Sequence, residues 1–298
     1  MSNITLATPC ASIARKEFQW QCGPRRLALG KNTKIMAILN VTPDSFSHDG
    51  VYRDPLKAVE KALAMERDGA DIIDVGGEST RPGAEAITVA EEQERVLPVV
   101  KQLAKVLKVP ISIDTTHSQT AAAALGEGAS IVNDISGLSF DYKMAKVVAQ
   151  HQAGCILMHI QGTPQTMQQN PSYRSLINEI SQGLKQNISK AEKAGMAKQC
   201  LVIDPGIGFG KTTAHNLEIL NRLNELVRLG LPILVGPSRK SFIGNILKAD
   251  VEQRLIGTIA CVTVAILHGA HIVRVHDVKA IKETVKMTDA ILDSGSMA

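Results

Sequence analysis

The chain has 298 residues, of which 44% are hydrophobic and 21% charged, with a formal net charge of +4 at pH 7. These values are typical of a globular protein that buries a substantial core. The lysines and arginines are scattered, which argues against nucleic-acid binding, and the longest uncharged apolar stretch, residues 255–267, is too short to cross a bilayer.

The cysteines indicate a reducing compartment. Five are present, an odd number without Cys-x-x-Cys spacing: Cys10, Cys22, Cys155, Cys200 and Cys261. Three of the five lie inside apolar runs, where a small buried hydrophobic residue is expected. The N-terminus lacks the apolar core of a secretory signal. We therefore expect a cytoplasmic protein that makes no contact with a membrane.

Residues 1–16 lack periodicity, and we expect them to form a loose leader. Residues 17–30 alternate around Gly23-Pro24, which predicts a short hairpin. One pattern then repeats: an apolar run, a turn rich in Gly, Asp and Ser, and an amphipathic helical stretch. The runs predict strands at 34–40, 70–76, 109–115, 130–135, 154–160, 200–204, 232–238 and 270–277. The intervening stretches predict helices at 54–68, 88–107, 117–127, 141–152, 173–194, 212–229, 250–268 and 277–292.

This alternation predicts an α/β fold, a (β/α)8 TIM barrel, because eight strand–helix units in about 260 residues match the size of that fold. We expect a single domain over residues 17–293, with the hairpin as an N-terminal extension. An open doubly wound sheet is the alternative. It would usually carry a GxGxxG turn after its first strand, whereas residues 40–46 read NVTPDSF.

Polar side chains stand at the ends of the predicted strands, where barrels of this class carry their chemistry. Taken singly, each could be a satisfied buried group or a helix cap, Asp74 and Asp134 in particular. Taken together, they predict one pocket. They are Asn40, Asp74, Glu78, Asp114, Asn133, Asp134, His159, Asp204, Ser238, Arg239, Lys240, Arg274 and His276.

The acceptors in this set suit a flat heterocycle. Asp114, Asn133 and Asp204 can accept hydrogen bonds from adjacent ring N–H and NH₂ groups, and Lys240 can donate to a ring carbonyl, which fits a pterin or a guanine-like base. Metal binding by the same carboxylates is the alternative. It is disfavoured because no histidine has ligand spacing with them, and the pair His268 and His271 spans a helix end and a strand start.

The cations gather near the last two strands, where barrels often bind phosphate. Arg239 and Lys240 follow the seventh strand, Arg274 and His276 close the eighth, and Arg81 comes from the loop after the second. Solvation at the surface is an equally good interpretation of Arg239, which stays undecided.

Two loop features bear on the ligand. Residues 205–212 read PGIGFGKT, one residue from a nucleotide P-loop, but Pro205 removes the conformational freedom and the backbone donor that such a loop needs. A nucleoside triphosphatase is therefore disfavoured. Phe46, Phe209 and Phe242 follow strands; Phe242 fits a core position, whereas Phe46 lies among polar residues and is suited to stack on a planar ligand.

Seven sequence blocks closely resemble the dihydropteroate synthases of the folate pathway. Residues 38–47, 74–83, 133–135, 157–159, 204–211, 238–241 and 274–277 read ILNVTPDSFS, DVGGESTRPG, NDI, LMH, DPGIGFGK, SRKS and RVHD. Residues 46–50 read FSHDG where the family commonly has Ser-Asp-Gly-Gly, which leaves the ordering of that loop open. His117 stands where a basic or larger residue is common, and we expect it to affect only a helix start.

The resemblance implies a transferase of a non-methyl alkyl group. It would condense 6-hydroxymethyl-7,8-dihydropterin diphosphate with p-aminobenzoate to give 7,8-dihydropteroate and diphosphate. Mg²⁺ assists this reaction in the family, sulfonamides compete for the p-aminobenzoate slot, and a homodimer is typical.

The resemblance also implies roles for residues at matching positions. Asp204, Lys240 and Arg274 would be catalytic. The pterin would be held by Asp114, Asn133, Met158, Asp204 and Lys240, the diphosphate by Asn40, Arg274 and His276, and Mg²⁺ by Asn40. The p-aminobenzoate slot would be formed by Phe46, Thr80, Arg81, Pro82, Phe209 and Ser238, with Phe46 and Asp44 on a mobile first loop.

Two alternatives remain open on the sequence. A pterin-binding methyltransferase would share the barrel and the acceptors, but it would need a corrinoid partner and gives no reason for the TPDSF and STRPG loops. A non-catalytic pterin-binding homologue is disfavoured by the presence of Asn40, Arg81 and Lys240. Measuring diphosphate release with and without p-aminobenzoate separates the three.

Overall fold

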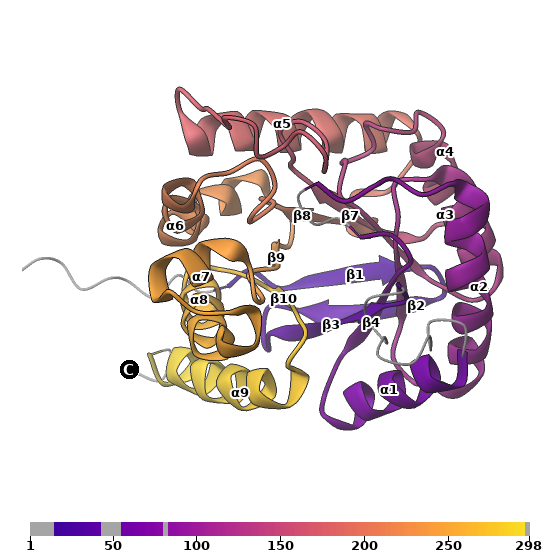
Figure 1. The fold of residues 1–298 in the computed structure, drawn as a ribbon, viewed down its shortest axis with the longest axis horizontal. Helices are drawn as coiled ribbons and strands as arrows, with labels where there is room; N and C mark the ends of the chain where they lie inside the picture. Colours follow the sequence, from indigo (N-terminus) through magenta and orange to yellow (C-terminus); the bar gives the residue numbers. More distant parts are fainter. Residues whose placement is uncertain (1–14, 43–54, 80–82, 296–298) are drawn as a thin grey trace, which may run out of the picture.

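The computed structural model describes residues 15–42, 55–79 and 83–295 (Figure 1). Eight parallel strands follow one another around a barrel: β3 Lys34–Asn40, β4 Ile72–Gly76, β5 Ile111–Asp114, β6 Ile131–Asp134, β7 Gly154–Met158, β8 Leu201–Asp204, β9 Leu234–Val235 and β10 Ile272–Val275. β10 pairs with both β3 and β9. The remaining seam is joined where the Ile203 N–H donates to the Pro232 carbonyl at 3.0 Å, beside a bridge between Ile203 and Ile233. The predicted barrel is confirmed.

Helices surround these strands (Figure 1). They are α1 Pro55–Arg67, α2 Val89–Val106, α3 Ser118–Gly126, α4 Met144–Gln150, α5 Leu176–Lys193, α6 Thr213–Asn221, α7 Ser241–Leu247, α8 Leu255–Leu267 and α9 Val278–Gly295, with 3₁₀ turns η3 Lys198–Cys200, η4 Leu223–Leu229 and η5 Val251–Gln253.

The main differences between the predicted elements and the structure lie in the second half of the chain. The stretch 212–229 divides into α6 and η4, and 250–268 divides into η5 and α8. α7 was not predicted as a separate helix; it is an extra short helix after the seventh barrel strand. β9 covers only two residues of the predicted run 232–238, because Pro232 and Pro237 have no N–H for the ladder.

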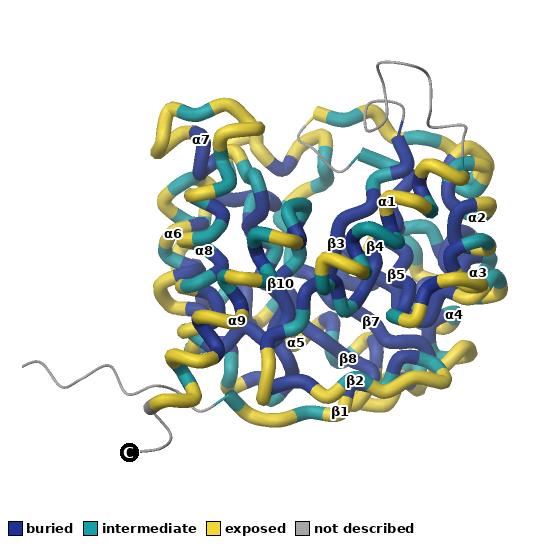
Figure 2. Tube along the Cα trace, turned by 90° about the horizontal axis from the view of Figure 1, so that it is seen from below, coloured by how far each residue is buried: buried dark blue, intermediate teal, exposed yellow. Residues whose placement is uncertain are grey.

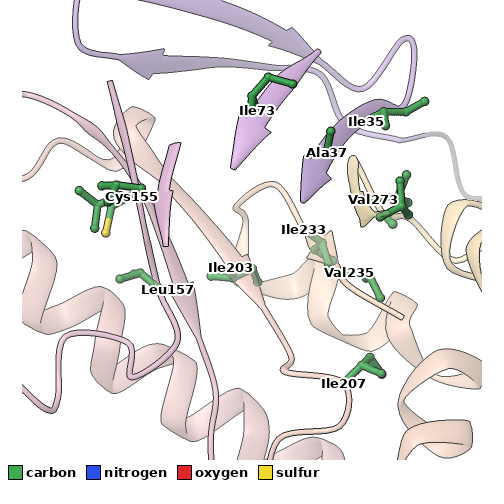
Figure 3. Packing of buried hydrophobic residues seen from close by; sticks show 14 of the residues in the cluster. Ile35, Ala37, Ile73, Cys155, Leu157, Ile203, Ile207, Ile233, Val235 and Val273 are labelled. Carbon is green, nitrogen blue, oxygen red and sulfur yellow. The ribbon is translucent and has the colours of Figure 1, made fainter. Parts of the chain in front are cut away.

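The barrel strands supply two cores because their side chains alternate in direction. One set faces the helices and forms the larger core; Figure 3 shows Ile35, Ala37, Ile73, Leu157 and Val273 from this set. The other set faces the barrel interior. At the N-terminal end of the strands it is mostly apolar, with Met36, Ile72, Ile131, Ile156, Val202, Leu234 and Ile272, and with Ser112 as the inward residue of β5. The same residue alternation thus fixes which side chains can reach the interior further along each strand.

The predicted hairpin is confirmed and closes this apolar end. β1 Phe18–Cys22 pairs antiparallel with β2 Arg25–Leu29. Trp20, Cys22 and Leu29 pack on the interior apolar layer, and the Trp20 indole donates to the Cys200 carbonyl at 2.9 Å. Figure 2 shows the hairpin lying across the end of the barrel opposite to α7. Any site must therefore open at the other end.

The N-terminal segment is described from Arg15 onward, so residues 1–14 of the expected leader, including Cys10, lie outside the described residues. Arg15 forms an ion pair with Asp289 of α9 at 2.6 Å. The His271 Nε2 lies 3.0 Å from the Lys16 carbonyl oxygen, and its Nδ1 accepts from the Ile233 N–H. Because His268 instead contacts the Leu220 carbonyl, this His-x-x-His pair does not converge on a common point.

Two further expectations concern the thiols and the membrane. The described cysteines are free, with Cys22, Cys155 and Cys200 buried and Cys261 half-buried. Among the helices that the structure describes, none combines the length and apolarity needed to span a membrane.

Candidate active site

The interior face changes from apolar to polar toward the carboxyl end on β4, β6, β8 and β10. Two residues beyond the apolar layer, the same alternation places Asp74 after Ile72, Asn133 after Ile131, Asp204 after Val202 and Arg274 after Ile272. Asp114 and Met158 occupy the corresponding positions on β5 and β7, and Asn40 lies one interior position further along β3, after Ile38. Seven predicted residues therefore point into one space because of strand geometry alone.

Arg274 lies at the centre of this polar layer. Its Nε donates to Asp74 Oδ2 and its Nη2 donates to Asp114 Oδ2, both at 2.6 Å. The Asn133 amide donates to the same Asp74 oxygen at 3.1 Å. One guanidinium thus connects β10, β4, β5 and β6 through charge-assisted bonds.

The sequence allowed Asp74 to be only a satisfied buried group or a helix cap, and the structure corrects this interpretation. It is fully buried and paired with Arg274, and its Oδ1 has no partner among the described residues. Asp134 does match that interpretation, because its two oxygens accept the Ser136 and Leu138 N–H groups of the following turn. Asp134 and Asp74 differ in whether backbone N–H groups of the following turn donate to their oxygens. The sequence does not reveal this difference.

The positions of Asp114 and Asp204 disfavour the ionised form of their carboxyl groups. Burial raises the pKa of Asp114 to about 7, with the Asp74 charge acting in the same direction and Arg274 opposing it. Burial raises the pKa of Asp204 to about 6, although the Gly206 N–H donates to its Oδ1 at 2.7 Å and favours the ionised form. A ligand that supplies N–H donors would recover part of the lost solvation.

An apolar wall stands beside these acceptors. It consists of Ile135, Met158, Met167 and Phe209, with Ile160 packed against it. Phe209 is only 6% exposed. The glycine-rich turn around it therefore packs the ring against Met158 and does not expose it to solvent.

Lys240 covers this wall. Its Nζ lies 4.0 Å from the centroid of the Phe209 ring, which is a cation–π distance. The lysine stem passes over Gly208, whose φ is +82° and whose added Cβ would lie 3.0 Å from Lys240 Cδ. The glycine therefore supplies both the left-handed backbone and the space for Lys240.

Lys211 is a functional candidate that the sequence analysis considered only as part of a false P-loop. It is buried, and its Nζ donates to the Phe209 carbonyl at 2.8 Å and lies 3.2 Å from His159 Nδ1. Burial lowers the pKa of Lys211 to about 7, while the Asp204 charge opposes this change. Lys211 thus ties the turn after β8 to the end of β7.

His276 and Ser238 form a pair where the last two strands end. Ser238 Oγ lies 3.0 Å from His276 Nδ1 and accepts the His276 backbone N–H at 3.2 Å. Burial lowers the pKa of His276 to about 3, and Arg274 adds to the effect. His276 is therefore neutral at pH 7, which corrects its assignment to the cations of this end.

Arg239 has a structural role, because both its side chain and its backbone are paired with neighbouring residues. It forms a two-point ion pair with Asp277, with Nε and Nη2 at 2.9 and 2.5 Å. Its backbone has φ of +56°, its N–H donates to Thr258 Oγ1, and its carbonyl accepts from Arg254. The undecided arginine thus anchors the start of α9.

Asn40 lies beside the central network. A Cβ added to Gly76 would lie 3.7 Å from Asp114 Oδ2 and 3.9 Å from Asn40 Oδ1, so both oxygens flank this glycine. Four predicted p-aminobenzoate contacts, Phe46, Thr80, Arg81 and Pro82, lie outside the described residues, as does Asp44.

A pocket of about 250 Å³ opens next to this network. Its walls include Glu78, Asp114, Thr115, His117, Ile135, Phe140, Thr163 and Pro164. His117 does more than begin α3, contrary to expectation: its Nδ1 lies 2.9 Å from Glu92 Oε2, and this bond raises the pKa of His117. Sequence reasoning missed Glu92, because a glutamate in the first turn of a helix usually only favours the helix dipole.

Comparison with known proteins decides the family. Residues 36–276 match the sequence profile of the family described as pterin binding enzyme. The chain is 49% identical over 284 residues to dihydropteroate synthase from Synechocystis sp., covering 95% of each chain. The chain belongs to the dihydropteroate synthase family. The resemblance found in the seven sequence blocks is thereby confirmed.

Solved structures of this family share the barrel. A dihydropteroate synthase from Clostridium difficile, determined in the presence of pteroic acid, matches with a TM-score of 0.84 and 46% identity, covering 88% of this chain and 98% of that one. The Xanthomonas albilineans dihydropteroate synthase with 4-aminobenzoic acid matches with a TM-score of 0.86 and 38% identity over 93% and 98% of the two chains.

Proposed function

We propose that this chain catalyses the condensation of 6-hydroxymethyl-7,8-dihydropterin diphosphate with p-aminobenzoate, releasing 7,8-dihydropteroate and diphosphate. The observation that carries the proposal is the position of Arg274, which contacts Asp114 at 2.6 Å. A cation for the leaving group and an acceptor for the heterocycle therefore adjoin in one space. Dihydropteroate synthase relatives at 42–49% identity over most of the chain support this reaction.

The pterin is assigned to the acceptors and the apolar wall. Asp114, Asn133 and Asp204 would accept its ring N–H and NH₂ donors, and Lys240 would donate to its carbonyl oxygen. Met158 is buried within the wall and offers a face for the bicyclic ring. The Lys240 ammonium over Phe209 is already placed at the edge of this wall.

Cleavage of the C–O bond to diphosphate is the demanding step. Arg274 uses Nε and Nη2 for its two aspartates, which leaves Nη1 free of those pairs and available to a phosphate oxygen. Neutral His276 can donate a hydrogen bond, and the N-terminus of α9 follows it directly. Ionised Asp204 and Asp114 would favour the cationic pterin methide that remains.

The Mg²⁺ expected for this reaction is assigned to Asn40. Its amide oxygen is the kind of donor that suits a hard cation that keeps several waters. Bound Mg²⁺ supplies charge stabilisation to the diphosphate. The chain's own contribution is to hold the Asn40 amide beside the network that contains Arg274 and Asp114.

The amine of p-aminobenzoate needs placement rather than a general base. Ser238 and Phe209 are the described residues assigned to its slot, together with Phe46, Thr80, Arg81 and Pro82. The Yersinia pestis dihydropteroate synthase structure with a sulfonamide drug complex supports a slot of this kind in the family. For this chain we infer competition between sulfonamides and p-aminobenzoate.

Diphosphate release with and without p-aminobenzoate tests the proposal. We expect formation of 7,8-dihydropteroate in equal amount to diphosphate when both substrates and Mg²⁺ are present. Methyl transfer to a corrinoid protein without diphosphate release would favour the methyltransferase alternative. Pterin binding without any turnover would favour a non-catalytic homologue.

We also propose that residues 17–293 form one pterin-binding domain that acts as a homodimer in the cytoplasm. Exposed apolar side chains on the adjoining helices α6, α7 and α8 support the dimer: Leu217, Ile246, Leu247, Ile256, Val264 and Leu267. Ile256 is 72% exposed, so Ile256→Glu should give a monomer in sedimentation equilibrium. An unchanged mass for this variant would place the interface elsewhere.

The free thiols support a reducing compartment, which cell fractionation checks.

A further inference from the structure

Three side chains outside the proposed substrate contacts converge beside the pocket. One ligand atom from each of Glu78, Glu92 and His117 lies within 4.8 Å of the others. Glu78 follows β4, Glu92 belongs to the first turns of α2, and His117 caps α3 after β5. Residues 78, 92 and 117 thus meet because consecutive units of the barrel bring their loops together at the same end.

The hydrogen bonds within this cluster leave a buried oxygen unused. Glu92 is fully buried, and its Oε2 accepts from Thr115 Oγ1 at 3.0 Å and lies 2.9 Å from His117 Nδ1. Its Oε1 has no partner among the residues that the structure describes. A carboxylate buried only for structural reasons normally satisfies both oxygens. Glu92 therefore keeps one oxygen without a donor among the described residues, while its other oxygen is paired with Thr115 and His117.

Glu78 has spare acceptor capacity as well. Its Oε1 receives a single long hydrogen bond, from the Ile87 N–H at 3.4 Å. Glu78 and His117 also line the 250 Å³ pocket, so they are reachable from solvent. Two carboxylates and one imidazole thus meet at an accessible wall, with the innermost carboxylate only partly satisfied.

We propose that Glu78, Glu92 and His117 bind a divalent transition-metal ion of the zinc class. One imidazole nitrogen and two carboxylate oxygens form a donor set that suits Zn²⁺, whereas Mg²⁺ prefers oxygen alone. Binding an ion through His117 Nδ1 would replace its present 2.9 Å hydrogen bond to Glu92 Oε2, because the ligands of a tetrahedral ion at about 2.1 Å lie about 3.4 Å apart.

The pocket leaves the fourth coordination position open. Its volume of about 250 Å³ holds several waters at roughly 30 Å³ each. Three protein ligands with an open position is the arrangement of accessible zinc sites rather than of closed structural ones. Asn40, to which Mg²⁺ is assigned, does not line this pocket, whereas Asp114 of the proposed pterin site does.

Zinc titration by calorimetry tests the site, with the chain first treated with a chelator, without substrates and with Mg²⁺ in excess. We expect one equivalent of Zn²⁺ to bind. Glu78→Gln and His117→Ala should each weaken the affinity by at least about 10–100-fold, the loss usual even for residues that only support a metal ligand. Matched controls are Glu85→Gln and His151→Ala, whose side chains are exposed. These should bind zinc like the parent.

Folding must be separated from ligand loss. Glu92→Gln changes a fully buried group and could fail to fold, so the half-exposed positions Glu78 and His117 carry the test. Far-UV circular dichroism of the four other variants should match the parent. Co²⁺ used as a second probe should give visible absorption bands in the parent that are lost in His117→Ala.

The outcomes are separable from those of the proposed reaction. Zinc affinity that is equal in His117→Ala and His151→Ala would overturn the site, as would the absence of saturable binding in the parent. Loss of zinc binding in Asn40→Ala, or competition with Mg²⁺, would assign the ion to the diphosphate position instead. One-equivalent binding in a chain that forms no 7,8-dihydropteroate would leave the metal site standing and reject only the reaction.

Discussion

The two ends of the barrel use the same strands and the same interior direction for opposite purposes. At the amino end, Met36, Ile72, Ile131, Ile156, Val202, Leu234 and Ile272 form a dry layer under the hairpin. At the carboxyl end, the next interior positions carry Asp74, Asp114, Asn133, Asp204 and Arg274.

The difference between the ends is energetic. Apolar burial at the amino end stabilises the fold by roughly 25 cal/mol per Å². The carboxyl end instead removes charges from water, which is why the pKa values of Asp114 and Asp204 are raised. The amino end therefore stabilises the fold, whereas the carboxyl end keeps polar groups that can form hydrogen bonds with a ligand.

Removing Arg274 should give the largest effect at the polar end. Arg274→Ala deletes the cation assigned to the leaving group, and we expect turnover to fall about 10²–10³-fold. The same substitution leaves Asp74 and Asp114 buried without their cation. Breaking a buried ion pair in this way typically lowers the free energy of unfolding by about 3–5 kcal/mol. Steady-state kinetics and urea unfolding measure the two effects.

The matched control is Arg222→Ala, which removes an exposed arginine paired with Glu218 and Glu225. We expect its turnover and its unfolding midpoint to equal those of the parent within error. If Arg274→Ala behaved like this control, Arg274 would have no role in the reaction.

Removing Trp20 should break the opposite end alone. Trp20 is 1% exposed and its indole donates to the Cys200 carbonyl, so Trp20→Ala should lower the free energy of unfolding by about 3–5 kcal/mol. The turnover number per folded molecule should stay unchanged, because the hairpin lies at the other end of the barrel. A large fall in turnover without loss of stability would contradict this separation of roles.

Lowering the pH should reduce kcat/KM but increase the contribution of the Asp204 and Asp114 carboxyls to stability. Protonated Asp204 and Asp114 lose acceptor capacity, so kcat/KM should fall as the pH drops below their pKa values of about 6 and about 7. Because both values lie above those of free carboxyls, the folded state binds these protons more tightly. Their contribution to stability therefore rises as the pH falls from about 7 toward the ordinary carboxyl range near 4.

Asp204→Asn should remove the acidic limb near pH 6 and lower turnover at pH 7.5 by about 10²–10³-fold, because it loses a preorganised charge. A pH profile of kcat/KM for parent and variant makes the comparison. An acidic limb that persists unchanged in the variant would assign that titration to another group.

Adding one methyl group at Gly208 should give the smallest effect. Gly208→Ala forces a residue with a side chain to φ of +82° and places its Cβ 3.0 Å from Lys240 Cδ. We expect a stability loss of about 1–2 kcal/mol and a several-fold higher KM for the pterin substrate. Gly195→Ala is the control, since its φ is +92° but no atom lies within 4 Å of the added Cβ. Equal KM values in the two variants would remove Lys240 from pterin binding.

Much of the fold was predictable because its information is local and periodic. Eight apolar runs alternating with amphipathic stretches predicted the barrel, and the alternation around Gly23-Pro24 predicted the hairpin. The divided helices and α7 were missed, since short helical turns joined to a longer helix have no periodic signal of their own.

The candidate site was predictable only in outline. The strand-end positions of Asp114, Asn133, Asp204, Lys240 and Arg274 follow from the alternation together with the family motifs. The partners do not: Arg274 and Asp74 are 200 residues apart, and their pairing depends on the barrel closing with β10 next to β3 and β4. The burial of Phe209 and the neutral state of His276 likewise depend on surrounding chains.

The sequence by itself determined which positions face the barrel interior and where along each strand they change from apolar to polar, because alternation is a property of the local backbone. Only the tertiary structure decided which polar groups meet, which stay unpaired and which change charge. Those properties depend on distance and on exclusion of water, and both are set by residues remote in the chain, as Glu92 with His117 and Lys211 with His159 show.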